Sequence, residues 1–246
     1  MALDLNDKTA NGNTLTNNGG TEYTASTPFA ASTIAVDLER DTPAYLTAAD
    51  HASLDITTTI SIEAWVKQET AGTNAAPNTI IIKGRTAGGN DTNYAFRIRD
   101  LIEFFYYDGT TFHVFGGNTG LADTTNWHHL AVTFTFGTGS SIKIYLDGTD
   151  ITSGGSWSSG NGNAAAVANN EALQIGCINY TTTPAQIFDG QLDEIRIWND
   201  IRTQQEIQDN DTIELTGTEA NLVAYWPFEA LTSARPGKRA LLGVGQ

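Results

Sequence analysis

Carboxylate pairs are the first side chains in this 246-residue chain that could do chemistry. Asp193 and Glu194 are adjacent, so in an extended strand they point to opposite faces and cannot act on one substrate. Asp37 and Glu39 share a face, but no third carboxylate follows in register. The chain also has no Gly-x-Ser-x-Gly nucleophile turn and no Gly-x-x-x-x-Gly-Lys phosphate loop. We therefore expect a protein without catalytic activity.

The histidine pair His128-His129 could bind a metal ion only if both rings pointed to the same place. Neighbouring residues of a strand point to opposite faces, so the two rings cannot share an ion. We expect these histidines to have surface and packing roles.

Asp193 is the most informative single residue. Regular alternation along residues 190–198 places it on the same face as Ile195 and Ile197, which is the apolar face. A carboxylate there is costly unless it is paired or binds a cation, and Ca²⁺ prefers oxygen ligands. Two interpretations stay open: a cation ligand, or an edge residue that hydrogen-bonds to loop amides.

Two aromatic residues stand in polar loops. Trp157 lies within the Gly-, Ser- and Asn-rich residues 153–163, and Tyr180 lies within residues 179–183. Sugars stack on aromatic rings and hydrogen-bond to short polar side chains, so these loops are candidates for carbohydrate binding, together with residues 84–93 and 116–126. The expected ligand-binding residues are Trp157, Tyr180, Asn161 and Asn179. The alternative is that both rings fold back over the edge of the domain.

The elements that must position these residues are mostly strands. Residues 59–67, 127–136 and 141–146 alternate apolar and polar side chains, as expected for antiparallel strands with one buried face. Further strands are predicted at residues 34–38, 79–83, 94–99, 101–107, 112–115, 173–176, 191–198 and 222–225.

Turn and cap signals complete the pattern. Asp108-Gly109 and Asp147-Gly148 each separate two predicted strands, and Asp-Gly tolerates positive φ at both central positions of a hairpin turn. Residues 203–206, Thr-Gln-Gln-Glu, match a capping box, so one short helix is predicted to end near Asn210. More than ten strands and one helix indicate a two-sheet sandwich or jelly roll.

Composition excludes several classes of partner. The formal net charge of −15 argues against nucleic acid and anionic membranes as partners. No apolar stretch approaches the roughly 20 residues that a membrane-spanning helix needs, so we expect no membrane insertion. The single cysteine, Cys177, excludes an internal disulfide and a cysteine-based metal cluster.

The two ends of the chain differ from its body. Residues 1–8 lack the basic and apolar stretches of a signal peptide, which fits a recloned mature fragment as well as an unsecreted protein. Residues 233–246 contain Arg235, Lys238 and Arg239, so we interpret them as a basic tail or linker, either an interaction arm or a remnant of cloning. We expect one domain over residues 1–232.

Four segments in order, with a fifth near the start, resemble the laminin-G-like, concanavalin A-like jelly-roll family, especially its bacterial and pentraxin-related branch. They are Ile60-Ser-Ile-Glu-Ala-Trp-Val66, Trp127-His-His-Leu-Ala-Val-Thr-Phe134 with Ile142-Lys-Ile-Tyr-Leu-Asp-Gly148, Gly190-Gln-Leu-Asp-Glu-Ile-Arg-Ile-Trp198, Leu222-Val-Ala-Tyr-Trp-Pro-Phe228 and the opening Asp7-Lys-Thr-Ala-Asn-Gly-Asn13. The resemblance covers residues 3–230 and implies an all-β, two-sheet antiparallel jelly-roll sandwich of the concanavalin A-like type with one short helix.

The resemblance also implies a calcium site. The Asp of the Gly-x-Leu-Asp-Glu motif corresponds to Asp193, and an early Phe-Asp-Gly-like position corresponds to Asp37. Here Leu38 replaces the glycine, which departs from the family pattern. Asp189 could contribute its side chain or its carbonyl group.

The function implied by the resemblance is non-catalytic recognition or adhesion, with carbohydrate or a surface protein as partner and Ca²⁺ as stabiliser. We expect a location outside the cell or at its surface, as part of a larger protein. The alternative is a phage virion structural, decoration or fibre protein, whose basic tail contacts an assembly partner. A glycoside hydrolase is a third possibility, but the Glu-x-Asp-x-x-Glu pattern of hydrolytic members is missing.

Overall fold

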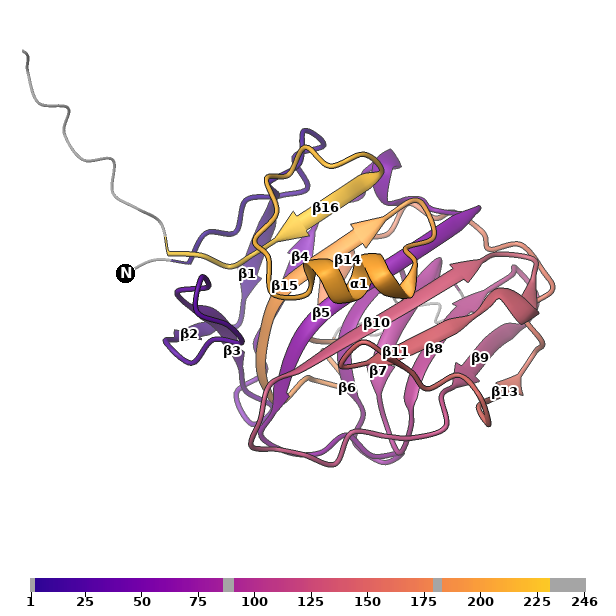
Figure 1. The fold of residues 1–246 in the computed structure, drawn as a ribbon, viewed down its shortest axis with the longest axis horizontal. Helices are drawn as coiled ribbons and strands as arrows, with labels where there is room; N and C mark the ends of the chain where they lie inside the picture. Colours follow the sequence, from indigo (N-terminus) through magenta and orange to yellow (C-terminus); the bar gives the residue numbers. More distant parts are fainter. Residues whose placement is uncertain (1–2, 86–90, 179–182, 231–246) are drawn as a thin grey trace, which may run out of the picture.

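The protein is a sandwich of two sheets. The computed structural model describes residues 3–85, 91–178 and 183–230, and its strands form two antiparallel sheets packed face to face (Figure 1). We call the sheet that carries helix α1 on its outer surface the front sheet, and the other the back sheet. The predicted all-β architecture is confirmed.

Each sheet contains eight strands. The back sheet has the order β1 (Leu15–Asn18), β4 (Tyr45–Ala48), β14 (Leu173–Ile175), β6 (Asn78–Lys83), β7 (Tyr94–Ile98), β8 (Ile102–Tyr107), β9 (Phe112–Gly116) and β13 (Ser156–Ser159). The front sheet has the order β12 (Thr149–Asp150), β11 (Lys143–Leu146), β10 (His128–Thr135), β5 (Thr59–Gln68), β15 (Gly190–Trp198), β3 (Ala35–Leu38) and β2 (Glu22–Thr24), and β16 (Leu222–Trp226) pairs with β15. Two 3₁₀ turns, η1 (Ala52–Leu54) and η2 (Gly139–Ser141), lie in the connections.

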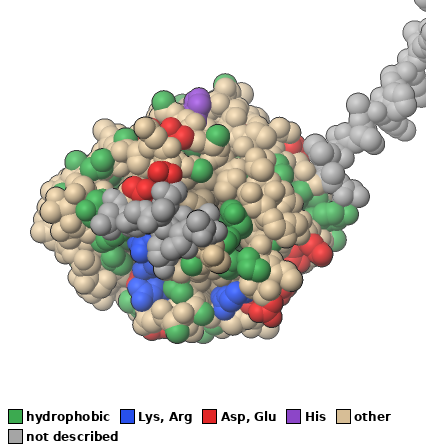
Figure 2. Space-filling model, turned by 180° about the vertical axis from the view of Figure 1, so that it is seen from behind, with side chains coloured by type: hydrophobic (Ala, Val, Ile, Leu, Met, Phe, Trp, Pro, Cys, Tyr) green, Lys and Arg blue, Asp and Glu red, His purple; other side chains and the backbone are tan. Residues whose placement is uncertain are grey.

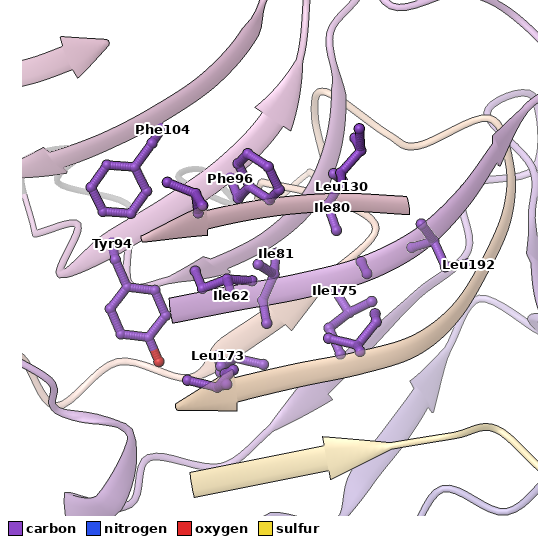
Figure 3. Packing of buried hydrophobic residues seen from close by; sticks show 14 of the residues in the cluster. Ile62, Ile80, Ile81, Tyr94, Phe96, Phe104, Leu130, Leu173, Ile175 and Leu192 are labelled. Carbon is purple, nitrogen blue, oxygen red and sulfur yellow. The ribbon is translucent and has the colours of Figure 1, made fainter. Parts of the chain in front are cut away.

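The core lies between the sheets, because every second residue of each strand points inward. Figure 3 shows Ile62 and Leu192 of the front sheet beside Ile81, Phe96 and Phe104 of the back sheet, all with fully buried side chains. Burying a side chain of this size stabilises the folded protein by about 1.5–3 kcal/mol. The inward-pointing apolar residues of the alternating strands therefore hold the two sheets together.

Helix α1 (Gln204–Asn210) lies on the outer surface of the front sheet (Figure 1). The Thr203 hydroxyl accepts a hydrogen bond from the backbone amide of Glu206, and the Glu206 carboxylate accepts one from the amide of Thr203. The predicted capping box is therefore confirmed, as is the end of the helix at residue 210. Ile207 packs against Ala131 of β10 and anchors the helix on the sheet.

The two predicted hairpin turns differ. Asp147 and Gly148 have φ values of 49° and 69°, as predicted for a turn with two positive φ angles. At the other turn only Gly109 has a positive φ, of 91°, so the prediction is wrong for Asp108. The Asp108 carboxylate accepts a hydrogen bond of 2.6 Å from the amide of Thr111, and this bond stabilises a different turn.

Strands β1, β2, β4 and β13 were not predicted, because they are short and lie at or near sheet edges, where polar side chains interrupt the alternation. A bridge between Leu3 and Ala230 brings the two ends of the described chain together. The predicted domain boundary at residue 232 lies just beyond the described part. No helix among the described residues is long and apolar enough to cross a membrane.

Candidate functional site

Asp193 lies on the outer face of the front sheet, so the prediction that it shares a face with Ile195 and Ile197 is wrong. It is paired with Trp65 of β5, whose side chain is directed away from the core, whereas Ile195 and Ile197 belong to the core. The register of β15 against β5 shifts after Asp193, and Glu194 has a φ of 52°. This β-bulge inserts one residue and reverses the alternation once.

The Asp193 carboxylate is fully buried beneath the chain that precedes β3. One oxygen accepts a hydrogen bond of 2.7 Å from the Ser32 hydroxyl, and the other accepts one of 2.9 Å from the backbone amide of Glu194. Burial raises the pKa of Asp193 well above its usual range, and the charges of Glu194 and Glu229 raise it further. The site therefore favours a proton or a bound cation over an uncompensated negative charge.

Asp37 lies in a different cluster from Asp193. One carboxylate oxygen from each of Asp37, Glu39 and Glu69 lies within 4.8 Å of the other two. Burial raises the pKa of Asp37 to about 6, with further contributions from Glu69 and Glu39. Asp189 is close to this cluster, but its carboxylate accepts a hydrogen bond of 3.0 Å from a backbone amide just after β3. The structure thus brings Asp37 and Asp189 close together and places Asp193 outside their cluster.

A buried polar network lies between the front sheet and the chain that covers it. Arg196 donates a hydrogen bond of 2.6 Å to Glu194, to which the Tyr225 hydroxyl also donates, and Glu63 lies 4.0 Å from Arg196. His129 is 3.6 Å from Glu63, and burial followed by the charge of Arg196 lowers its pKa to about 3. All five side chains are at most 2% exposed, so this network supports packing and offers a ligand no access.

Trp157 lies in strand β13 and not in a loop, which corrects its predicted position. It is paired with Phe115 of β9, and its ring centroid is 5.3 Å from that of Phe115 and 5.8 Å from that of Phe134. The half-buried ring packs against the core at the edge of the back sheet, as in the alternative interpretation. A contact of Trp157 with a ligand stays a prediction.

The loop after β13 is held by His113. The Nδ1 atom of His113 accepts hydrogen bonds from the backbone amides of Asn161, at 3.1 Å, and Gly162, at 2.9 Å. The Asn161 side chain is exposed, as a ligand-binding residue must be. Two other predicted ligand-binding residues, Asn179 and Tyr180, lie outside the described residues, as do the basic residues Arg235, Lys238 and Arg239 of the tail.

A pocket of about 310 Å³ opens at the end of the back sheet where β7 begins and β8 ends. We call it the Tyr107 pocket. Its walls come from three connections, and they are formed by Asp91, Thr92, Tyr107, Gly109, Val167, Ala168 and Asn169.

The walls of the Tyr107 pocket combine apolar and polar groups. The half-buried ring of Tyr107 lies 4.9 Å from that of Phe112, and Val167 is 46% exposed. The Thr92 side chain is fully buried, and its hydroxyl has no hydrogen-bond partner among the described residues. A buried hydroxyl without a partner is uncommon and is ordinarily completed by an internal water molecule.

Lys83 fixes one wall of the Tyr107 pocket. Its Nζ atom is fully buried and donates hydrogen bonds to Asp50 at 2.8 Å, to the carbonyl of Asn169 at 2.9 Å and to the carbonyl of Glu171 at 2.6 Å. Asp55 lies 3.1 Å away. This one ammonium group ties residues 169–171 to the end of β6, so the pocket is preformed.

Part of this pocket was predicted from the sequence, and the rest was not. Residues 84–93 were a candidate loop, and Asp91 and Thr92 belong to it. Tyr107 and Asn169 were not selected, because they come within reach of Thr92 only through the pairing of β6, β7 and β8. A tyrosine at the end of a strand directly before an Asp-Gly turn was the available signal.

The sequence of the chain matches one protein-family model. This model, described as the concanavalin A-like lectin/glucanases superfamily, matches residues 40–208, which is more than half of the chain. A comparison with curated protein sequences found no match.

Solved structures with a similar fold include several binding domains. Domain 4 of AbnA, a GH43 extracellular arabinanase from Geobacillus stearothermophilus solved with arabinotriose, has a TM-score of 0.60 at 19% identity, over 84% of this chain and 92% of that one. A botulinum neurotoxin type C structure described by its interaction with two ganglioside molecules has a TM-score of 0.56 at 12% identity, over 81% of this chain and 46% of that one. The enzymatically active domain of tailspike protein 2 from bacteriophage CBA120 has a TM-score of 0.56 at 12% identity, over 93% of this chain and 33% of that one. At these identities the likeness shows the fold alone.

Proposed function

The chain belongs to the concanavalin A-like lectin/glucanase superfamily, and from this premise we propose that it is a non-catalytic carbohydrate-recognition module. The observation that carries the proposal is the preformed Tyr107 pocket, in which the half-buried ring of Tyr107 and the exposed side chain of Val167 lie beside polar residues. A domain of similar fold, the binding domain of botulinum neurotoxin DC, was solved in complex with rat synaptotagmin II, so the choice of carbohydrate over protein rests on the chemistry of the pocket.

The Tyr107 pocket offers the groups that a sugar ring needs. The face of the tyrosine ring and the exposed methyl groups of Val167 can pack against the C–H face of the sugar. The amide nitrogen of the half-buried Asn169 donates one hydrogen to the carbonyl of Asp91, and its second hydrogen can be donated to a sugar hydroxyl. The volume of about 310 Å³ suits one or two sugar residues.

The same pocket supports binding without hydrolysis. Glycoside hydrolases of the common types need two carboxyl groups, about 5–9.5 Å apart, on either side of the bond that is cleaved. Asp91 is the only carboxylate among the residues that line the Tyr107 pocket. A protein with this pocket can hold a glycan but lacks the second group for acid–base chemistry there.

Calcium is part of the proposal. Around Asp193 lie the Ser32 hydroxyl and the Glu229 carboxylate, so the donors are the oxygen atoms that Ca²⁺ prefers. A bound cation would also compensate the buried charge of Asp193. A second candidate set consists of Asp37, Glu39 and Glu69, beside which Asp189 presents its backbone carbonyl to the Glu69 amide.

Thermal denaturation with Ca²⁺ and with a chelator tests the calcium proposal. We expect Ca²⁺ to raise the Tm of the wild-type protein, and either Asp193→Asn or Asp37→Asn to abolish the increase and so identify the set. An equal Tm with calcium and with chelator would refute calcium binding.

A glycan array followed by calorimetry tests the carbohydrate proposal. We expect binding to at least one class of glycan, and we expect Tyr107→Ala or Val167→Ser to weaken it about tenfold through lost stacking or lost apolar contact. Tyr23→Ala is the matched control, because Tyr23 is 42% exposed on β2 of the other sheet. Equal losses in the variants and the control, or no binding by the wild type, would contradict the proposal.

The proposed location follows from the proposed function. We place the module outside a cell or at its surface, where glycans are found, as part of a larger protein. The virion alternative makes a different prediction, namely that the gene lies among capsid and tail genes. A long multidomain reading frame would instead support the surface module.

A further inference from the structure

A second pocket lies at the opposite end of β7 and β8 from the Tyr107 pocket. It has a volume of about 320 Å³. Its walls come from the connections β5–β6, β7–β8 and β9–β10, and they are formed by Ala71, Gly72, Thr73, Arg99, Asp100, Thr119, Gly120, Leu121 and Ala122. We call it the Arg99 pocket.

The Arg99 pocket is preformed. Gln68, which is fully buried, accepts a hydrogen bond of 2.9 Å from the Gly72 amide and donates one of 2.7 Å to the carbonyl of Leu121, so one side chain ties two of the walls together. A Cβ atom added at Gly120 would lie 2.3 Å from the carbonyl oxygen of Asp100. Gly120 therefore packs directly against the backbone of the β7–β8 turn. Because the walls are already held in place, few side chains or loops need to become ordered when a ligand binds.

Two consecutive residues supply the polar chemistry of this pocket. The Arg99 side chain is 26% exposed, its Nη1 atom lies 3.3 Å from Glu103, and its buried Nε atom has no hydrogen-bond partner among the described residues. The Asp100 carboxylate accepts hydrogen bonds from the backbone amide and the side chain of Asn74, and each of its oxygens has a further lone pair. A donor and an acceptor thus stand side by side.

The charges around the pocket favour a neutral ligand. Arg97 and Arg99 both contact Glu103, at 2.8 Å and 3.3 Å, and Asp100 supplies a second negative charge. The local sum is zero, so an anionic group gains no net attraction. Figure 2 shows the molecule from behind, on the side of the back sheet, as a mostly uncharged surface with small separate groups of basic and acidic side chains. Adjacent hydroxyls of a sugar can accept from the guanidinium group and donate to the carboxylate.

We propose that the Arg99 pocket is a second binding site for a neutral saccharide, which makes the protein bivalent. The inference rests on the proposed carbohydrate-binding function. Thr92 precedes β7 and Arg99 follows it, so the five strand residues, at about 3.3 Å each, separate the two pockets by roughly 17 Å or more. One sugar residue cannot reach both pockets. Two glycan chains can occupy them together, and the protein can then cross-link polysaccharides.

The test is an NMR titration of the full chain with neutral trisaccharides, arabinotriose among them, combined with calorimetry. We expect two binding sites per chain and two separate groups of shifted amide signals, one around Thr92 and Gly109 and the other around Thr73 and Gly120. Arg99→Gln should weaken the second site about tenfold or more, since a hydrogen bond from a charged group is lost, and should leave the first site unchanged. Lys143→Gln is the control, because Lys143 is a cation on the other sheet with 46% side-chain exposure.

The outcomes separate the two proposals. A stoichiometry of one site, lost in Tyr107→Ala and retained in Arg99→Gln, would overturn the second site and leave the proposed function intact. Tighter binding of uronate-containing oligosaccharides than of neutral ones at Arg99 would overturn the neutral ligand class. Absence of binding to every neutral glycan would overturn both proposals. Thermal melts of each variant verify that the fold is retained.

Discussion

Replacing Asp37 by asparagine should stabilise the calcium-free protein near neutral pH. The carboxylate is half-buried and lies within 4.8 Å of oxygens of Glu39 and Glu69, and its pKa is raised to about 6. A carboxyl group whose pKa is higher in the folded protein than in the unfolded chain favours folding below pH 3.8, and this contribution is lost as the pH rises through 6. The asparagine side chain of the variant carries no charge at any pH, so it avoids this loss.

The expected size of this effect follows from the shift. A rise in pKa from 3.8 to about 6 corresponds to about 3 kcal/mol if the group were fully desolvated. Because Asp37 is only half-buried, solvent screening lowers the expected stabilisation to about 1–1.5 kcal/mol at pH 7–8. At pH 4 the variant and the wild type should have nearly equal stability.

Urea denaturation between pH 4 and pH 8, with chelator and with Ca²⁺, measures this prediction. With chelator, the free energy of unfolding of Asp37→Asn should exceed that of the wild type increasingly as the pH rises. With Ca²⁺ the order should reverse if this cluster is the calcium site, because the variant lacks a ligand. Asp209→Asn, an exposed change on α1, which packs on β10, is the control. A variant that loses stability equally at pH 4 and pH 8 with chelator would refute the electrostatic reasoning.

Three further predictions concern the framework. Thr203→Ala should lower the stability by about 1 kcal/mol, measured by thermal denaturation, because it removes the cap of α1. His129 should destabilise the protein as the pH drops from 6.5 towards 3, since it binds a proton in the unfolded chain but not in the folded one, so the stability of His129→Gln relative to the wild type should rise over this range in urea titrations. Lys83→Met should lower the stability by about 3 kcal/mol or more and weaken glycan binding in calorimetry, because Asp50 and Asp55 lose their buried partner and Asn169 is released.

The long strands could be predicted from the sequence because every second residue of such a strand faces the core and is apolar. Residues 59–67 alternate cleanly, and β5 spans Thr59–Gln68. The position of Asp193 was not predictable, because the bulge at Glu194 is defined by pairing with β5, which the sequence of β15 alone does not encode. Trp157 was predicted to lie in a loop because its strand has the sequence Ser-Trp-Ser-Ser and lies at the edge of a sheet. In such a strand the only sequence feature that indicates burial is the one aromatic residue.

The pockets were less predictable than the strands because their walls are assembled from distant connections. Single loops could be selected from composition, as residues 84–93 and 116–126 were, but a pocket forms only where several connections meet at one end of the sheet. Which connections meet depends on strand order, and β14 lies between β4 and β6 although it follows β6 by about 90 residues. The residues 167–169 of the Tyr107 pocket precede β14 and are brought there by that order.

Buried polar side chains take the place of disulfides in holding the connections at both ends of the back sheet. Cys177 is the single cysteine, and it is buried. At one end Lys83 joins residues 50–55 to residues 169–171, and at the other end Gln68 joins residue 72 to residue 121. Each tether is buried and hydrogen-bonded to several partners, so breaking it leaves unsatisfied groups in the interior and is costly. At each of the two pockets, a buried polar residue near the end of a strand therefore holds the walls in place, while the residues that form the walls can differ in chemistry.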